Sequence, residues 1–192
     1  MGKVMYKPIL KNEVRVFKQP MTKLFDEKRV FVAGYGSLLF SDGWTNRGYM
    51  MQKIKPEDMI ECKIDNFERG KFGVYFNQNF YGVIRTKGKY INAALVEILT
   101  LKDWIELMAT ECIAGIFPNY NYRVVDVTDC VTDVELPENA VVHMVVNEPR
   151  NRVLIKNSID APGYYKYVYN GVLKERSNMF FEEFMKTGGV LP

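Results

Sequence analysis

Short apolar runs, bounded by glycines and polar residues, follow one another along most of the chain after residue 28. They are rich in β-branched and aromatic residues, which predicts strands. The predicted strands are residues 29–34, 59–64, 73–76, 81–86, 91–99, 122–127 and 140–146. The Asn-Gln-Asn segment 77–79 separates two of them like the turn of a hairpin. Because few helices come between the strands, we expect an α+β fold with a mixed, mostly antiparallel sheet and helices packed on it, not a series of βαβ units.

Apolar residues at helical spacing predict helices at three places. Residues 178–186 carry an aromatic stripe and end at two glycines. A shorter helix is expected over 164–170, after the Ala-Pro-Gly segment 161–163. The third helix begins at Thr100, which precedes Asp103 with the spacing of a capping box, and runs to about residue 112. Its apolar face is formed by Leu101, Trp104, Ile105 and Met108.

One carboxylate of this third helix lies on an unexpected face. At about 100° per residue, Glu111 points between Trp104 and Leu107, toward the apolar side. Asp103 and Glu106 point away from that side. An inward carboxylate requires a cation or hydrogen-bond donors, or else it works as an acid or base, and the negative end of the helix dipole favours the second role. The alternative is that the helix frays in its last turn and Glu111 reaches water.

Length and charge narrow the class of protein. The chain has 192 residues, 47% of them apolar, which is enough for one compact domain. Because residues 1–28 show no sustained period, we assign them to an N-terminal extension, packed or partly mobile, and residues 29–192 to the domain. The net charge of +3 is dispersed, so we expect no nucleic-acid partner. The sequence has neither a signal peptide nor an apolar run near the roughly 20 residues of a spanning helix, so we expect a cytoplasmic protein without membrane contact.

The cysteines and the histidine argue against metal chemistry. Cys62, Cys112 and Cys130 are widely separated and form no C-x-x-C pair, and His143 is the only histidine. These spacings give neither a disulfide framework nor a zinc site. We therefore expect reduced thiols, no metal and no cofactor.

The first predicted strand ends in a Gly-Tyr-Gly-Ser motif at residues 34–37. A nucleophile elbow requires G-x-S-x-G, but leucines follow Ser37, and the one imidazole base, His143, lies within a predicted strand. The motif also lacks the lysine and the spacing of a P-loop. What remains is a backbone site, in which Gly36 permits a sharp turn that gathers amides around an anion such as a carboxylate, or else a plain strand-to-loop turn. The amides concerned are those of Ser37, Leu38 and Leu39.

Several segments together carry a resemblance to a known family. They are Phe-Val-Ala-Gly-Tyr-Gly-Ser-Leu at 31–38, Tyr-Gly-Val at 81–83 leading into 93–98, the helix 104–111 followed by Tyr-Arg-Val-Val at 122–125, and Ala-Pro-Gly-Tyr at 161–164 before an aromatic helix. In this order and spacing, over residues 29–187, the chain resembles the γ-glutamylcyclotransferase superfamily, which includes the glutathione-specific ChaC-type enzymes and the AIG2-like proteins.

The resemblance implies a fold, a reaction and a set of residues. The implied fold is a small mixed β-barrel flanked by helices. The implied reaction closes the γ-glutamyl group of glutathione, a γ-glutamyl dipeptide or a γ-glutamylamine to 5-oxoproline and releases the amine partner, with Glu111 as general acid/base. The residues implied to bind this small-molecule substrate are Tyr35, Gly36, Ser37, Leu38, Tyr122 and Tyr164.

The chain also departs from the family pattern. The segment 112–121 is longer than the matching segment of the smaller family members, so either Tyr120 or Tyr122 matches the family's tyrosine. Residues 1–28 have no counterpart in the family pattern. A non-catalytic AIG2-like module that binds a small ligand or a protein is the alternative function, although a retained inward glutamate argues against it. The side chains expected to shape specificity are Phe40, Trp44, Phe117 and Tyr120.

Overall fold

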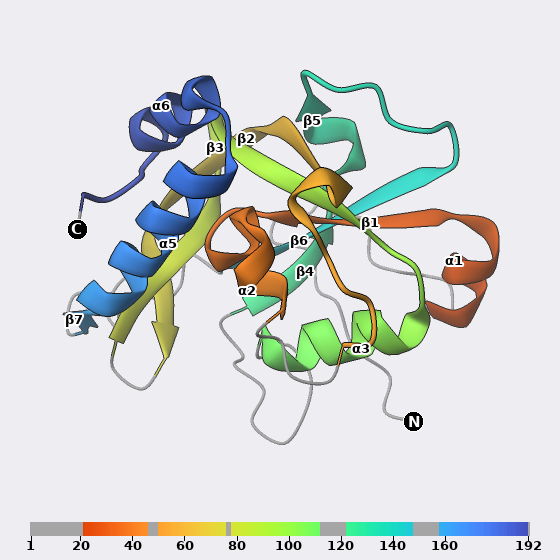
Figure 1. Ribbon diagram of the computed structural model, residues 1–192. Helices are drawn as coiled ribbons and strands as arrows, with labels where there is room; N and C mark the ends of the chain where they lie inside the picture. The colour runs from red at the N-terminus through yellow and green to blue at the C-terminus, as the bar shows by residue number, and fades with distance from the viewer. Residues whose placement is uncertain (1–20, 46–49, 76–77, 112–121, 148–157, 192) are drawn as a thin grey trace.

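The computed structural model describes residues 21–45, 50–75, 78–111, 122–147 and 158–191, which form a curled β-sheet with helices packed against it (Figure 1). The helices are α1 (Met21–Glu27), α2 (Ser41–Thr45), α3 (Leu101–Thr110), α5 (Pro162–Glu175) and α6 (Asn178–Lys186). The strands are β1 (Arg29–Gly34), β2 (Met59–Tyr75), β3 (Gln78–Ile98), β4 (Tyr122–Asp126), β5 (Val131–Thr132), β6 (Ala140–Asn147) and β7 (Ile159–Asp160). Three single turns of 3-10 helix are η1 (Ser37–Leu39), η2 (Pro56–Asp58) and η3 (Thr128–Cys130).

The sheet is mixed and mostly antiparallel. Its strand order is β4-β6-β1-β3-β2-β5, and β7 pairs with β3 outside this path. Among the described strands, β1 runs parallel to β6 and β3 runs parallel to β7, while the other pairings are antiparallel. The predicted α+β class with a mostly antiparallel sheet is therefore confirmed.

The curl of the sheet comes from one long hairpin. The segments predicted as short strands at 59–64, 73–76, 81–86 and 91–99 lie within β2 and β3, so their strand conformation is confirmed for the described residues up to Ile98. The breaks expected at 65–72 and 87–90 were wrong. Their pairing shifts register between Asp65 and Phe67 and again between Gly70 and Gly73. Such bulges bend and twist a strand pair, which lets a hairpin of this length wrap into half of a barrel. The exposed residues 87–90, which separate two of the predicted strands, lie within β3 at the first shift.

The predicted hairpin turn is shifted along the chain. Tyr75 pairs with Gln78 and Val74 with Asn79, so two of the three expected turn residues belong to β3. The third, Asn77, lies outside the described residues. The hairpin itself is confirmed, whereas its turn was placed too late in the sequence.

Side chains of β1 alternate between two cores, because the strand lies in the middle of the sheet. Phe31 and Ala33 enter an inner core supplied by the strands and their immediate continuations. Val30 and Val32 enter an outer core between the sheet and the helices. The helical residues of the outer core include Leu24 of α1, Trp44 of α2, Trp104 of α3, Val168 of α5 and Phe184 of α6.

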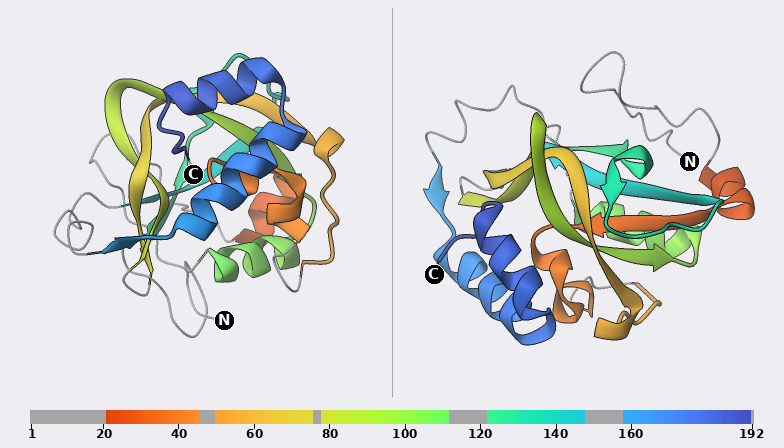
Figure 2. Two further views of the ribbon diagram at one scale, coloured as in Figure 1. Left: turned by 60° about the vertical axis from the view of Figure 1, so that its left-hand side comes forward. Right: turned by 90° about the horizontal axis from the view of Figure 1, so that it is seen from above.

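The helices lie in two groups. α5 and α6 contact each other and β3, and Figures 1 and 2 show them side by side along the hairpin. α1 contacts α3 and β1 toward the other end of the sheet. α1 falls within the predicted extension 1–28, of which residues 1–20 lie outside the described part. None of the described helices has the length and apolar character needed to cross a membrane.

Helix α3 follows its predicted cap but not all of its predicted faces. The Thr100 hydroxyl accepts a hydrogen bond from the Asp103 amide at 3.0 Å, as expected for an N-cap. The Asp103 side chain, predicted to point to solvent, is buried instead, because it also accepts a bond from the Met51 amide at 2.7 Å. Ile105, predicted on the apolar face, is exposed, since the covered stripe is centred on Trp104, Leu107 and Met108.

The two C-terminal helices are close to their predictions. α6 has the predicted bounds, and the Ser177 hydroxyl at its N-cap accepts a bond from the Phe180 amide at 3.1 Å. α5 is longer at both ends than the predicted 164–170, because Pro162 starts it two residues earlier and its apolar residues continue to Val172.

Candidate functional site

A cavity of about 270 Å³ opens where β1 ends between its longer neighbours. β1 pairs with β6 only as far as Val32 and His143, so Val145 of β6 lies beyond the last pair. The residues that follow β1 fill this space, and they line the cavity together with parts of β3, β4, β6, α3 and α5. The lining residues are Val32, Ala33, Tyr35, Gly36, Ser37, Leu38, Phe80, Tyr81, Thr110, Glu111, Tyr122, Val145 and Tyr164.

The structure brings the catalytic and substrate-binding residues implied by the resemblance to this one cavity. Tyr35, Gly36, Ser37 and Leu38 come from the turn after β1, Glu111 from the end of α3, Tyr122 from the start of β4 and Tyr164 from the first turn of α5. They are far apart in the sequence and meet only because the sheet curls. Their chemical roles remain predictions.

Glycines hold the turn after β1 in place. A Cβ added to Gly34 would lie 2.3 Å from the Leu38 carbonyl oxygen, and one added to Gly43 would lie 1.6 Å from the Ser37 carbonyl oxygen. Side chains at these two positions would therefore displace the turn. The Leu39 amide donates to the Gly36 carbonyl oxygen at 3.0 Å. The Leu39 amide is thus bonded within η1, and the expectation that this amide points at an anion was wrong. For the Ser37 and Leu38 amides, the role in binding an anion stays a prediction.

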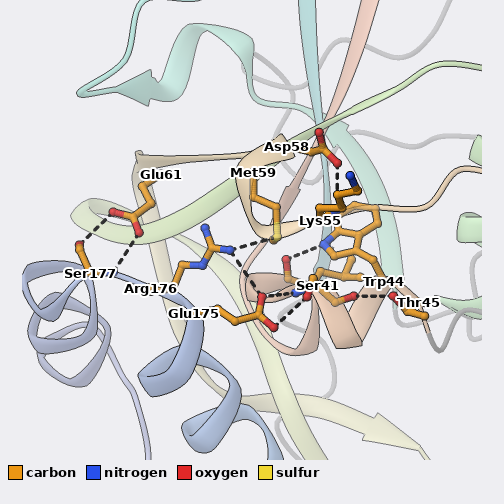
Figure 3. A network of polar contacts seen from close by, with 11 residues as sticks. Ser41, Trp44, Thr45, Lys55, Asp58, Met59, Glu61, Glu175, Arg176 and Ser177 are labelled. Atoms are coloured by element: carbon orange, nitrogen blue, oxygen red, sulfur yellow. Dashed lines mark hydrogen bonds and ion pairs between the residues drawn. The ribbon is translucent and has the colours of Figure 1, made fainter.

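Helix α2 packs against the turn and links it by hydrogen bonds to the end of α5 (Figure 3). The Trp44 indole nitrogen donates to the Leu38 carbonyl oxygen at 2.9 Å. At the start of α2, the Ser41 amide and hydroxyl donate to the Glu175 carboxylate at 2.7 and 2.8 Å. The Nη2 atom of Arg176 lies 3.8 Å from the same carboxylate and also donates to the Met59 sulfur at 3.2 Å. The turn is therefore fixed by packing and hydrogen bonds before any ligand binds.

Glu111 is the one carboxylate among the described residues that line the cavity. It is the C-cap residue of α3, and its amide donates to the Leu107 carbonyl oxygen at 2.9 Å, so the helix does not fray before it. The side chain is half-buried, and its Oε1 atom is fully shielded from solvent. Glu111 thus lines the cavity with a carboxylate that is partly removed from water, a position from which an acid or base could act on a bound ligand.

The remaining wall is largely aromatic. Tyr164 packs against Phe80 with ring centroids 5.0 Å apart and against Tyr81 at 5.9 Å. Its hydroxyl reaches the turn, since a Cβ added to Gly36 would lie 2.6 Å from it. Phe80 and Tyr81 were not predicted as site residues, although Tyr81 belongs to the Tyr-Gly-Val segment of the resemblance. Burial raises the pKa of Tyr81, while a bond from the Val190 amide and the charge of Arg69 act in the opposite direction.

Two of the residues expected to shape specificity lie elsewhere. Phe40 is buried against α5, where its ring is 4.9 Å from that of Tyr167, and Trp44 lies beneath the turn. Neither lines the cavity, because the chain turns away from it after Leu39. Phe117 and Tyr120 lie outside the described residues, whereas Tyr122 is at the cavity.

His143, Cys62 and Cys130 do not line the cavity, and Cys112 lies outside the described residues. His143 is fully buried in β6, where the Trp104 indole nitrogen donates to its Nδ1 at 3.3 Å, and burial lowers its pKa to about 3. Ser37 therefore has no imidazole base beside it. Burial raises the pKa of the Cys62 thiol to about 12. Within the described segments, no cluster of three or more His, Cys, Asp or Glu side chains could hold a metal ion.

Comparison with known proteins rests on structure. No protein-family model and no curated protein matches the sequence. A human structure, "uncharacterized protein loc79017", superposes with a TM-score of 0.55 at 13% identity over 85% of this chain and 90% of that one. A structure named "Gamma-glutamyl cyclotransferase" gives 0.53 at 12% identity over the same shares of the two chains, 85% and 90%. YkqA from Bacillus subtilis gives 0.54 at 15% identity over 90% of this chain and 58% of that one.

Likeness at these identities shows the fold alone. The shared architecture covers the curled sheet and its helices, which is the scaffold that forms the cavity. The chain has the fold of gamma-glutamyl cyclotransferase.

Proposed function

We propose that this protein is a γ-glutamylcyclotransferase, which closes a γ-glutamyl group to 5-oxoproline and releases the amine partner. The observation that carries the proposal is the shielded Oε1 of Glu111, which shares a cavity with the Gly-Tyr-Gly-Ser turn. The fold of a protein named for this reaction adds support. The proposed substrates are small molecules with a γ-glutamyl amide bond: glutathione, γ-glutamyl dipeptides or γ-glutamylamines.

The reaction is intramolecular, so positioning does much of the work. The substrate's α-amine attacks its own γ-carbonyl carbon, a C–N bond forms, and the bond from that carbon to the departing nitrogen breaks. Because both reacting groups belong to one molecule, a cavity that holds the folded conformer replaces a bimolecular encounter.

Proton transfer is the task of Glu111. Its carboxylate first accepts a proton from the α-ammonium, because only the neutral amine has the lone pair that attacks, and it returns this proton to the departing nitrogen. The attacking nitrogen loses a second proton as the C–N bond forms, and this proton leaves with the amine partner, which departs as an ammonium. One carboxylate therefore serves both steps, and the balance requires no further reactant. Backbone amides of Ser37 and Leu38 hold the substrate carboxylate, or the oxyanion that develops on the carbonyl oxygen.

The test is the substitution Glu111→Gln, which keeps the size of the side chain and removes the base. We expect 5-oxoproline formation, measured by mass spectrometry with glutathione, a γ-glutamyl dipeptide and a γ-glutamylamine, to fall by about 10²- to 10⁴-fold. Circular dichroism and thermal unfolding should match the unmodified protein, because the residue is only half-buried.

The matched control is Glu106→Gln, one turn earlier in α3 and outside the cavity wall. It should leave the rate unchanged. Full activity of Glu111→Gln would overturn the assignment of the base. If the unmodified protein turns over none of the three substrates but binds one of them, the non-catalytic binding module is the better description.

A further inference from the structure

Arg69 is a buried cation whose charge no carboxylate of the described residues neutralises. The residue lies in β2 and is 3% exposed. Its Nη2 donates to the Asn92 carbonyl oxygen and, at 2.8 Å, to Asn92 Oδ1. The guanidinium also stacks on the Phe184 ring, 4.7 Å from its centroid. Its Nε and Nη1 are shielded from solvent and have no hydrogen-bond partner among the described residues.

Arg176, the second buried arginine among the described residues, has the acidic neighbours that Arg69 lacks. Arg176 lies 3.8 Å from the Glu175 carboxylate, and Glu61 also acts on its charge. The groups that act on Arg69 are the phenols of Tyr81, Tyr164 and Tyr35, and no carboxylate of the described residues is among them. Glu111 is therefore not its counter-ion. Burial lowers the pKa of Arg69 to about 10, which leaves the guanidinium charged at neutral pH.

The three tyrosines that act on Arg69 all line the cavity. Phe184, on which the guanidinium stacks, packs against Tyr81 with ring centroids 5.8 Å apart. The Tyr81 hydroxyl accepts a bond from the Val190 amide at 2.7 Å, in the segment that follows α6. Gly188 in that segment lies against the Arg69 backbone. Arg69 is thus placed directly behind the aromatic wall of the cavity.

We infer that Arg69 makes the cavity selective for ligands that carry a carboxylate. An isolated charge in a medium of low dielectric acts over a longer range than one in water, so its field crosses the thin aromatic wall. Within the described part of the chain, no carboxylate accompanies this buried cation, which is costly unless an anion does so in the functional state. Arg69 acts through the wall without touching the ligand and is a positioning residue.

This inference rests on the proposed function for the identity of the ligand. The relevant group is then the α-carboxylate of the γ-glutamyl unit. Arg69 would favour compounds with a free α-carboxylate over those in which this group is an uncharged amide.

The test measures binding and leaves turnover aside. In the full chain with Glu111→Gln, calorimetry gives the dissociation constants of γ-glutamyl methylamide and of its analogue with an α-carboxamide. Adding Arg69→Met should weaken the carboxylate ligand by about tenfold or more and the carboxamide by less than about twofold. Arg69→Lys, which keeps the charge, should stay within about threefold for both ligands.

Lys71→Met is the matched control, because it removes a cation two residues further along β2 that is exposed and paired with Asp160. It should change neither constant. Equal weakening of both ligands by Arg69→Met would reveal a structural role only and overturn the inference, as would no weakening at all. If Arg69→Met does not fold, the two dissociation constants of the parent protein with Glu111→Gln decide the question. Equal affinity of that protein for the carboxylate and the carboxamide ligand would also overturn the inference.

The two proposals fail separately. A protein that makes no 5-oxoproline but shows the Arg69-dependent preference overturns the enzymatic proposal and keeps this one. A protein that makes 5-oxoproline without that preference overturns only the role of Arg69. Failure of every form, the unmodified protein included, to bind either ligand overturns both.

Discussion

Gly36 decides how close Tyr164 can come to the turn that ends β1. The space where its Cβ would lie is taken by the Tyr164 hydroxyl on one side, at 2.6 Å, and by the Tyr81 Cβ on the other, at 3.3 Å. A single hydrogen in place of a side chain thus allows two aromatic walls to meet the backbone. This contact explains the second glycine of the motif better than a nucleophilic role for Ser37 does.

Gly36→Ala should therefore move the Tyr164 ring out of the cavity. We expect 5-oxoproline formation to fall by about tenfold, measured as kcat/KM, because a wall residue is misplaced. If the Tyr164 hydroxyl is what the added methyl group meets, Gly36→Ala should have little further effect on kcat/KM in a Tyr164→Phe background. The effects of the two substitutions on kcat/KM would then be non-additive. Gly163→Ala is the control, since nothing lies within 4 Å of the added Cβ, and it should keep full activity. Strict additivity would contradict this account.

At the scale of elements, the end of α6 and the long hairpin depend on each other. Gly188 follows α6 with φ of 103°, a region that favours glycine, and its Cβ position lies 2.4 Å from the Arg69 carbonyl oxygen. Thr187 beside it donates to Asn92, the residue that also binds Arg69. The helix end is therefore docked on the strand that carries the buried cation.

Gly188→Ala should destabilise the protein by roughly 2 to 5 kcal/mol, from the left-handed backbone together with the overlap. Gly88→Ala, where φ is 76° but nothing lies within 4 Å, isolates the backbone cost and should lose only about 1 kcal/mol. Denaturant unfolding gives both values. Equal losses in the two variants would show that the contact with Arg69 is relaxed at little cost.

At the scale of the whole molecule, burial of the single histidine links folding to pH. His143 is fully buried, and its pKa falls from 6.5 to about 3. The unfolded chain therefore binds one more proton than the folded chain between these two values. Stability from this source is complete above pH 6.5 and is lost as the pH falls toward 3, with a limiting slope of about 1.4 kcal/mol per pH unit.

The free energy of unfolding should accordingly drop by about 2 kcal/mol between pH 7.5 and pH 5, before most carboxylates titrate. His143→Asn has no imidazole and can still accept a bond from Trp104. Its stability should be lower at neutral pH but nearly independent of pH in this window. Urea titrations at several pH values measure both slopes, and a slope retained by the variant would assign the effect to other groups.

The sequence by itself determined the local elements and most of the candidate site. Periodicity gave β1, α3 and α6, and the cap at Thr100 fixed the phase that turns Glu111 inward. These are short-range properties, in which a residue's neighbours in the chain decide its conformation. The site residues from Tyr35 to Tyr164 were found because the resemblance joined distant segments that local physics could not join.

Only the tertiary structure decided what depends on contacts between distant segments. Two bulges turned four expected strands into one curled hairpin, and the loop that binds Asp103 buried a carboxylate expected in solvent. Phe80 and Tyr81 line the cavity, and Arg69 is buried, because the curled sheet packs against α5 and α6. The burial and the electrostatic environment of a residue are sums over such contacts. They therefore cannot be predicted from local sequence patterns alone.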